Sequence, residues 1–555
     1  MIRTLLKGFT ALLIVLAIIV VWAITLNKPK QQHFEHYSLP LDIRTLPQNW
    51  TADIRQQVSH TSFGSRLVPL HWLLNLEQPF DRQQFLDPEH IRSLGFIPQQ
   101  HATNNTYGLP VGFSIDYKHD VPWVGLTCAA CHTALIEHQG QKILIDGGAG
   151  KLHFSAFERS LFNAITLTIE EPERFARFSR TITSTSEKEL KTQLIEWQKK
   201  MARHLAINQT DTPYGHGRLD AFGIIFNAVA VKALGVATNV RTPDAPVSIP
   251  VLWDAPHFDV VQWNGSAPNR EPGPLGQNIP TAIGVYADLE MGPEAIGGYS
   301  SSVRVKNLGY LQHSYAKLTA PKWPEDLLGK LDSALVAKGQ TLYETHCLSC
   351  HALSRNNSAT AKYRTTLIPA SEVGTDLAMV TNFTEQRVSS GFLEGRKTAI
   401  ITGPPLEAEV SPVDLVINAA AGVMLKKPFS TLSAVATQYE SNYPPPKSRT
   451  SKVYKARPLN GIWTSGPYLH NGSVPTLWDL LQPPQQRPTQ FFTGSIELDV
   501  KRVGYSVNAT SDNAARPYAS SMDTRLYGNS NAGHRYGTAL SNDEKWALIE
   551  YLKSL

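Results

Sequence analysis

The chain has 555 residues, enough for two to four domains of about 150 residues each. Charged residues make up 18% and hydrophobic residues 42%, which excludes a chain that is disordered throughout. The net charge is only +5 and no dense run of Lys or Arg is present, so nucleic acid is not an expected partner. Four cysteines are too few for a disulfide scaffold.

The N-terminus carries a long apolar segment. No charged residue occurs from Phe9 to Leu26, and a helix of this length would span roughly 27 Å, close to the thickness of a bilayer core. Arg3 and Lys7 precede it, which favours a cytoplasmic N-terminus and export of the rest. The sequence therefore predicts a single-pass anchor over residues 1–26, with the body on the periplasmic side of the bacterial inner membrane. A cleaved signal peptide that releases the exported chain is the alternative.

The cysteines form two pairs, and each pair is followed directly by a histidine, at Cys128, Cys131 and His132 and again at Cys347, Cys350 and His351. This C-x-x-C-H spacing is the attachment signature of c-type haem. The two thiols bond to the porphyrin vinyl groups, and the adjacent histidine ligates the iron. A zinc site would leave both histidines unused, and a redox disulfide belongs in a βαβ context that the sequence lacks. Two complete motifs that use every cysteine predict two covalently bound c-type haems.

The remaining pattern predicts two haem lobes. Residues 27–60 read as a polar linker, 61–330 as an N-terminal lobe with the active-site haem, and 331–555 as a C-terminal cytochrome c domain. Amphipathic helical patterns occupy 150–205, and another helix leads directly into the second motif. The last helix begins at a Ser541–Glu544 capping box and is expected to pack on the helix before the second motif. The expected fold is mainly α with long ordered loops, two cytochrome c-type lobes behind an N-terminal transmembrane helix.

Residues 456–481 read ARPLNGIWTSGPYLHNGSVPTLWDLL. With the two upstream motifs, this segment resembles the di-haem cytochrome c peroxidase superfamily and, within it, the rubber oxygenase branch of di-haem c-type dioxygenases. The segments 217–227 and 250–265 and the closing residues fit the same group. The resemblance covers roughly residues 110–555. It implies a reactive haem on His132 and a six-coordinate, electron-transferring haem on His351.

The resemblance also locates the sixth ligand of the second haem. In the peroxidases this ligand is a Met in the Pro-Tyr-Met-His segment, but here Leu469 occupies that position and cannot bind iron. The adjacent His470 is the first candidate and His534 is the second. Met379 and Met424 are residual candidates.

Other side chains are candidates around the first haem and the propionates. Trp253 and Trp263, with His257 between them, lie in a segment that resembles the active-site wall of the oxygenase branch, although core packing is the competing interpretation of each. Arg218 and Arg457 are candidates to bind haem propionates. Minor candidates for a resting-state ligand follow the first motif at His138 and His153.

The function expected from these residues is an oxidoreductase that activates hydrogen peroxide or dioxygen at the first haem. The partners expected are a small redox protein or a quinol-linked electron donor, with membrane contact through the N-terminal helix. Three alternatives stay open: a rubber-oxygenase-like dioxygenase that cleaves an apolar alkene, a two-haem electron carrier without its own substrate, and an enzyme that modifies another protein. A carrier needs far fewer than 555 residues, which favours a substrate site.

Overall fold

A computed structural model of the chain describes Val21 and residues 38–269, 272–294, 298–353, 363–436, 451–506 and 518–555. Helices account for 41% of the structure and strands for 18%. The expectation of a mainly α protein is therefore wrong. The strands are short, and their pairing depends on partners elsewhere in the chain, so little of it is visible as local alternation.

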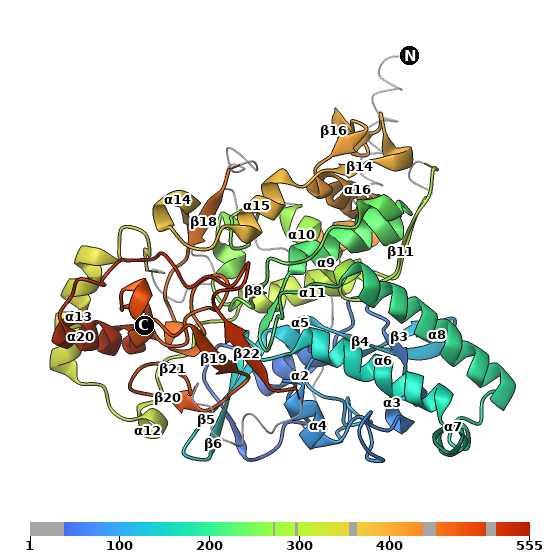
Figure 1. Cartoon of the computed structure of the whole chain (residues 1–555), viewed down its shortest axis with the longest axis horizontal. Coiled ribbons are helices and arrows are strands. Elements are labelled where there is room, and N and C mark those ends of the chain that lie inside the picture. Colours follow the sequence, from blue (N-terminus) through green and yellow to red (C-terminus); the bar gives the residue numbers. More distant parts are fainter. Residues whose placement is uncertain are drawn as a thin grey trace.

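The helices before residue 330 are α2 (Ala52–His60), α3 (Leu70–Asn75), α4 (Pro88–Ser93), α5 (Cys128–Cys131), α6 (Phe154–Glu170), α7 (Pro172–Ser179), α8 (Glu187–Ile207), α9 (Ala221–Asn227), α10 (Gly273–Gly284), α11 (Val305–Ala316) and α12 (Glu325–Leu328). The later helices are α13 (Ser333–His346), α14 (Ala370–Val373), α15 (Ala378–Glu385), α16 (Pro412–Lys426), α17 (Pro428–Ala436), α18 (Leu477–Leu480) and α20 (Asn542–Ser554). The helices predicted within residues 150–205 are confirmed as α6, α7 and α8. These three helices lie together at one side of the molecule (Figure 1).

Two three-stranded sheets surround the first haem motif. One has the order β2 (Val68–Pro69), β4 (Val121–Leu126), β3 (Phe113–Lys118), and the other has the order β1 (Ile43–Thr45), β6 (Gln141–Asp146), β5 (Thr133–His138). The motif helix α5 connects β4 of the first sheet to β5 of the second, so both sheets fix its position. Strand β1 and helix α2 belong to the segment expected to be a linker, which is folded from residue 38 onward.

The other strands form two-stranded pairs. They are β7 (Arg218–Leu219) with β8 (Val247–Ser248), β9 (Val260–Val261) with β10 (Ala267–Pro268), β11 (Leu289–Met291) with β12 (Tyr299–Ser301), β13 (Thr366–Pro369) with β18 (Val453–Ala456), β14 (Val388–Ser389) with β17 (Glu409–Val410), β15 (Lys397–Ala399) with β16 (Thr402–Pro405), β19 (Gln490–Thr493) with β22 (Ser520–Asp523), and β20 (Leu498–Asp499) with β21 (Gly504–Tyr505). Several pairs join distant segments. For example, β13 and β18 pair antiparallel and form part of the wall of a cavity next to the second C-x-x-C-H motif.

The C-terminal helix α20 lies beside α13, the helix that leads into the second motif (Figure 1). A Cβ added to Gly339 of α13 would lie 2.0 Å from the carbonyl oxygen of Ala547, so the two backbones approach closely. Tyr343 and Tyr551 pack with ring centroids 5.3 Å apart. The Ser541–Glu544 capping box and the packing of the last helix on the first helix of the C-terminal region are both confirmed.

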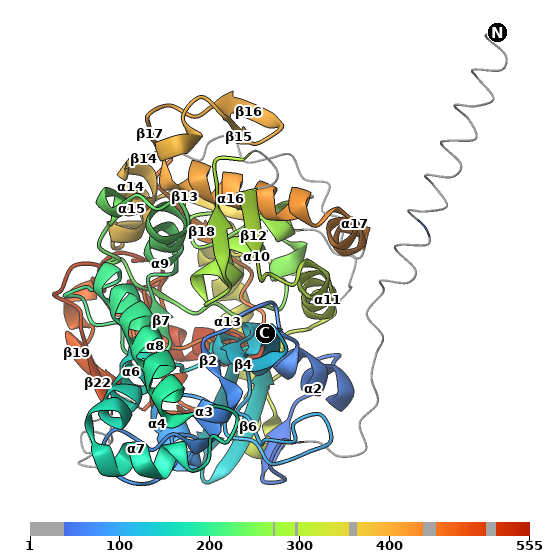
Figure 2. The same ribbon diagram turned by 90° about the vertical axis from the view of Figure 1, so that its right-hand side faces the viewer.

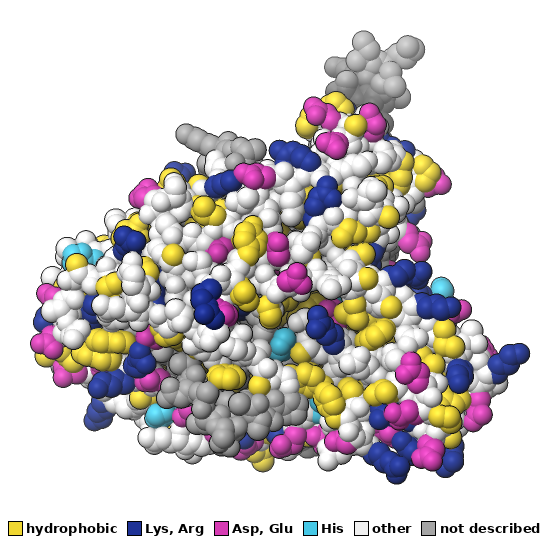
Figure 3. Space-filling model, in the orientation of Figure 1, with side chains coloured by type: hydrophobic (Ala, Val, Ile, Leu, Met, Phe, Trp, Pro, Cys, Tyr) yellow, Lys and Arg dark blue, Asp and Glu magenta, His cyan; other side chains and the backbone are white. Residues whose placement is uncertain are grey.

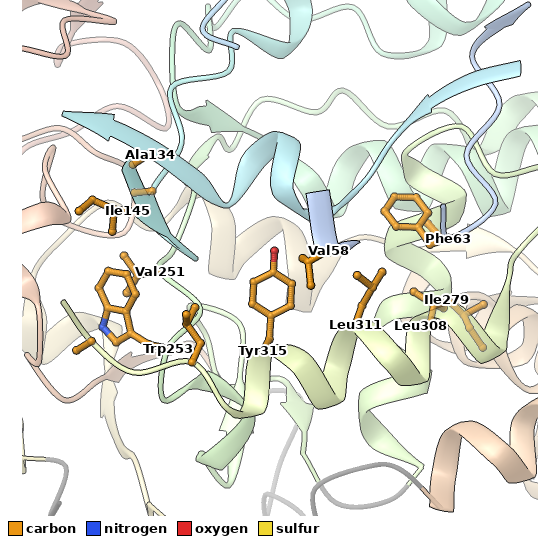
Figure 4. Close-up of a cluster of buried hydrophobic side chains, with 14 of the residues drawn as sticks. Val58, Phe63, Ala134, Ile145, Val251, Trp253, Ile279, Leu308, Leu311 and Tyr315 are labelled. Atoms are coloured by element: carbon orange, nitrogen blue, oxygen red, sulfur yellow. The ribbon is translucent and has the colours of Figure 1, made fainter. Parts of the chain in front are cut away.

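One hydrophobic cluster reaches across most of the chain, from Leu46 to Leu552. Its centre lies along α11, where Leu308, Leu311 and Tyr315 pack near Val58 from α2 (Figure 4). A second cluster fills the space between α6, α8 and the β2–β4–β3 sheet. Figure 2 shows α16 and the pairs β14–β17 and β15–β16 at the opposite end of the molecule from α7.

Within the part of the chain that the structure describes, no helix has the length and apolar character needed to cross a bilayer. The predicted transmembrane helix and single-pass location at the inner membrane are therefore not supported and are corrected here. Residues 1–26, on which both predictions rested, lie outside the described residues except for Val21. On the face seen in Figure 3, basic and acidic side chains are interspersed, in line with the small net charge.

Candidate haem sites

The first motif forms the short helix α5. The Thr127 side chain caps its N-terminus by accepting a hydrogen bond from the amide of Ala129. His132 ends the helix, and its Nδ1–H donates to the carbonyl of Pro250 at 2.9 Å. Cys128 and Cys131 are free thiols, and burial raises the pKa of each to about 12. The motif thus presents two unpaired thiols and one oriented imidazole.

The second motif begins where α13 ends. The amide of Cys347 donates to the carbonyl of Tyr343 at 2.8 Å, and the Tyr343 hydroxyl donates to the carbonyl of His351. The His351 Nδ1–H donates to the carbonyl of Arg457 at 2.7 Å. Leu348, inside the motif, is 38% exposed, so this site reaches the surface.

Both motif histidines therefore have the same hydrogen-bonding arrangement. In each, Nδ1 is occupied by a backbone carbonyl, which leaves Nε2 as the nitrogen free to bind a metal. Such a carbonyl fixes the ring orientation and raises the basicity of the ligating nitrogen. Burial lowers the pKa of both imidazoles, so the neutral form that binds metal is favoured.

A cavity of about 240 Å³ opens next to the second motif. Its wall is largely apolar, and the motif residues Cys347, Cys350 and His351 form one side. The apolar lining includes Ile249, Val251, Trp263, Ile368, Leu459, Ile462, Tyr468, Leu469, Leu477, Leu480, Leu481, Leu548 and Leu552. This is the kind of pocket that a macrocycle bonded to two of its lining cysteines requires.

Two half-buried cations, Lys455 and Arg457, line the same cavity. Burial lowers the pKa of Lys455 to about 7 and that of Arg457 to about 10. Lys455 donates to the carbonyl of Val260 and Arg457 to that of Val251, and both cations lie over the ring of Phe258. Among the described residues that line the cavity, none is acidic. Two cations without a lining carboxylate fit the two propionates of a haem.

His534 faces His351 across the cavity, and their ring centroids are 6.3 Å apart. Two imidazoles bound to opposite sides of one metal, with metal–nitrogen bonds of about 2 Å, have ring centres roughly 6 Å apart. The Nδ1 of His534 is buried and has no hydrogen-bond partner in the described structure. His470 also lines the cavity, but its Nε2 forms a 3.0 Å hydrogen bond with the hydroxyl of Tyr454.

The loop that carries His534 is held by Arg487. This buried guanidinium donates five hydrogen bonds, all to backbone carbonyls: those of Leu480, Gln482, Asn531, Gly533 and His534. His534 itself has a left-handed backbone with φ of 47°, and its amide donates to the carbonyl of Val373. Gly533 precedes it, and a Cβ there would lie 2.4 Å from the backbone of Gly374. The position of His534 is therefore set by backbone contacts.

The side chains predicted for the first haem's distal side are dispersed. Trp253 is fully buried in the large core cluster, and its Nε1–H donates to the carbonyl of Asn460 at 2.8 Å. His257 is buried, with Nε2 bonded to the carbonyl of Ala316 at 2.9 Å. Trp263 lines the cavity of the second motif instead. Their assignment to catalysis stays a prediction.

The other candidates occupy varied positions. Arg218 is buried and donates to Tyr214, Met522 and Asn529. Neither Met379 nor Met424 is among the lining residues of the cavity. The Nδ1 of His138 lies 3.9 Å from a carboxylate oxygen of Glu497. His153 caps the N-terminus of helix α6.

Three residues at the candidate site were not predicted from the sequence: Tyr454, Lys455 and Arg487. Lys455 and Tyr454 lie on β18, directly before Arg457, and the alternation of a strand could have indicated that Lys455 and Arg457 share a face. No local pattern marks Arg487, because its partners lie in two separate loops.

Comparison with known proteins places these features in a family. Residues 453–492, which include Lys455, Arg457 and His470, match the family described as RoxA-like, cytochrome c-like. The chain is 30% identical over 595 residues to the uncharacterized protein y4iJ of Sinorhizobium fredii, covering 92% of this chain and 93% of that protein. The uncharacterized protein y4iM of the same organism is 24% identical over 361 residues, covering 59% and 69%.

The matched cytochrome c-like segment, together with the attachment motifs, indicates a protein with a c-type haem and a redox function. The segment points to the RoxA-like di-haem cytochromes as the wider group. By its similarity over nearly the whole length of both proteins, the chain belongs to the family of y4iJ.

Proposed function

We propose that this protein is a di-haem c-type oxidoreductase. In the proposal, the haem on His132 activates hydrogen peroxide or dioxygen, and the haem on His351 transfers electrons. Bound haem supplies reversible one-electron redox chemistry and, where one face is free, a place for a small oxidant. The observation that carries the proposal is the cavity in which His351 and His534 face each other at 6.3 Å beside two free cysteines.

In this proposal each residue of the second site has a separate role. Cys347 and Cys350 tether the cofactor, and the Arg457 carbonyl orients His351 so that Nε2 points away from it. Lys455 and Arg457 would pair with the propionates, because they are half-buried cations in a cavity wall without a carboxylate among its described residues.

We assign the sixth ligand to His534. Support comes from the ring separation, from the unpartnered Nδ1 and from the backbone contacts that fix the loop. His470 then has a different role: it packs against Tyr454, with ring centroids 4.2 Å apart, and its nitrogen is held by that hydroxyl. Two nitrogen ligands keep an iron low-spin and lower its potential, which suits electron transfer.

A dioxygenase that cleaves an apolar alkene is the second candidate. The match to a RoxA-like segment supports it, as does the resemblance to the rubber oxygenases. We expect the electron donor, a small redox protein or a quinol-linked carrier, to approach the second site, where Leu348 is exposed.

A pyridine haemochrome assay and low-temperature EPR of the exported protein test the proposal. We expect two haems per chain and one low-spin signal from a pair of imidazoles. His534→Ala should abolish that signal while both haems remain, and His470→Ala, the matched control, should retain it. Loss of the signal in His470→Ala alone would return the sixth ligand to His470, and fewer than two haems would refute the di-haem proposal. Consumption of hydrogen peroxide with a reduced small cytochrome, compared with uptake of dioxygen on an alkene, separates the two candidate reactions.

A further inference from the structure

The segment Pro250–Val251 belongs to both haem sites. The carbonyl of Pro250 accepts the Nδ1–H of His132 from the first motif at 2.9 Å. The same two residues line the cavity of the second motif. A single dipeptide therefore orients the imidazole of one site and forms part of the wall of the other.

Arg457 connects this dipeptide to the second histidine. Its Nη1–H donates to the carbonyl of Val251 at 3.2 Å, and its own carbonyl accepts the Nδ1–H of His351 at 2.7 Å. Three hydrogen bonds thus lead from the imidazole of His132 through Pro250–Val251 and Arg457 to the imidazole of His351.

A second contact holds the two segments together. The Nε1–H of Trp253 donates to the carbonyl of Asn460 at 2.8 Å, and the Trp253 ring lies against Gly461, where an added Cβ would be 2.9 Å from the indole. Trp253 is fully buried. The hydrogen bond from Trp253 to Asn460 therefore fixes the chain after Val251 against the chain after Arg457, independently of the bond that Arg457 itself makes. We call the hydrogen-bonded connection between the two histidines the bridge, and the bond from Trp253 the clamp bond.

We propose that Arg457 couples the two haem sites, acting as a positioning residue for both. Its side chain holds the carbonyl of Val251, in the peptide group next to the one whose carbonyl orients His132, and its own backbone carbonyl orients His351. A displacement of one imidazole changes its bond to a carbonyl, and the backbone of Pro250–Val251 and the side chain of Arg457 transmit that displacement to the other. With haems bound at both motifs, the coupling would accompany the transfer of one electron from one haem to the other, which balances without a proton.

This inference rests on the proposed di-haem function and adds a property that the propionate role of Arg457 does not require. A residue that only balanced charge would affect the second site, whose cavity it lines. A coupling residue also affects the first site, which it reaches through the carbonyl of Val251.

The test compares Arg457→Gln with Lys455→Gln. Both variants remove one half-buried cation from the same cavity wall, but Arg457 bonds to Val251, whereas Lys455 bonds to Val260. Haem content is measured first by pyridine haemochrome. A spectroelectrochemical titration then gives the reduction potential of each haem, and rapid mixing with substoichiometric dithionite gives the rate of electron redistribution between them.

We expect Arg457→Gln to shift the potential of the first haem and to slow redistribution by about 10-fold, comparable to the smallest effects on activity of mutating groups that support a ligating histidine. Lys455→Gln should shift only the second potential. If wild-type protein holds fewer than two haems, the proposed function fails. If both haems are present and Arg457→Gln leaves the first potential and the rate unchanged, or Lys455→Gln reproduces its effects, the coupling role is refuted.

If Arg457→Gln does not accumulate as folded protein, Trp253→Phe gives the same answer. It removes the clamp bond to Asn460 and leaves the charge of the cavity intact. Slower redistribution with an unchanged second potential supports the bridge. An unchanged rate in this variant refutes it.

Discussion

Arg487 gives the sharpest test of how the second site is built, because one side chain holds the whole loop of His534. Its five N–H groups all donate to backbone carbonyls, at distances from 2.6 to 3.1 Å, so no donor of the guanidinium is left over. The residue is only 3% exposed. Arg487→Met keeps a long apolar side chain of similar reach and removes every one of these bonds.

The cost follows from the chemistry of those bonds. A hydrogen bond from a charged donor contributes about 1.5–3 kcal/mol, and a buried carbonyl left without a donor costs about 1–3 kcal/mol. The five bonds share one charge whose burial is itself unfavourable, so their contributions do not add in full. We expect Arg487→Met to lower the free energy of unfolding by about 3–5 kcal/mol, well below the sum of five separate charged hydrogen bonds.

Urea unfolding of the haem-loaded protein measures this loss, with EPR as a second readout. The low-spin signal assigned to His351 and His534 should weaken in Arg487→Met while the haem content is unchanged, because the loop is released and the cysteine bonds are not. Arg525→Met is the control, since Arg525 is exposed and its ion pair among the described residues is with Asp523. A loss below about 1 kcal/mol, the value for a surface ion pair, together with an unaltered EPR signal, would refute the argument.

Further predictions concern the frame around the sites. Gly339→Ala should destabilise the protein by about 1–3 kcal/mol, because the new methyl meets the carbonyl of Ala547. Gly276→Ala, in a helix with open space at that position, should instead stabilise it by about 0.5–1 kcal/mol, and thermal unfolding of the pair checks both signs. Burial alone would raise the pKa of Asp116. The hydrogen bonds from Arg304 and Arg66 outweigh this effect and hold the pKa below its usual value. The stabilisation is therefore present above about pH 4 and is lost as the pH falls through the native pKa, so the urea midpoints of wild type and Asp116→Asn should differ at pH 7 and draw together progressively as the pH falls below about 4.

The sequence was sufficient wherever the chemistry is local. The two C-x-x-C-H motifs predict haem attachment without any other part of the chain. The reason is that the two thiols and the adjacent imidazole must lie within one helical turn of each other to bind one cofactor. The capping box at Ser541 is equally local and is present in the structure. The contact between α13 and α20 followed from two amphipathic helices at the ends of one region.

What the sequence left open depends on contacts between distant segments. His470 lies in the more familiar segment, but Tyr454 occupies its nitrogen, whereas His534 is aimed at His351 by a loop whose shape is set by Arg487. The mainly α expectation failed for the same reason, since pairs such as β13 with β18 join residues far apart in the chain. The direction in which a loop side chain points and the partner of a short strand both depend on other segments of the chain. Neither can be predicted from the local residues alone.

The extent of the large apolar cluster has a consequence for how the molecule acquires its shape. Leu46 and Val58 near one end of the described chain share this cluster with Leu548 and Leu552 near the other. Bringing residues so far apart in the sequence together costs conformational entropy before the apolar contacts contribute their stabilisation. This cost slows the rate-limiting step of folding. We therefore expect the interior to consolidate late, once the final helix is available, and partly synthesised chains to expose apolar surface that requires protection by chaperones.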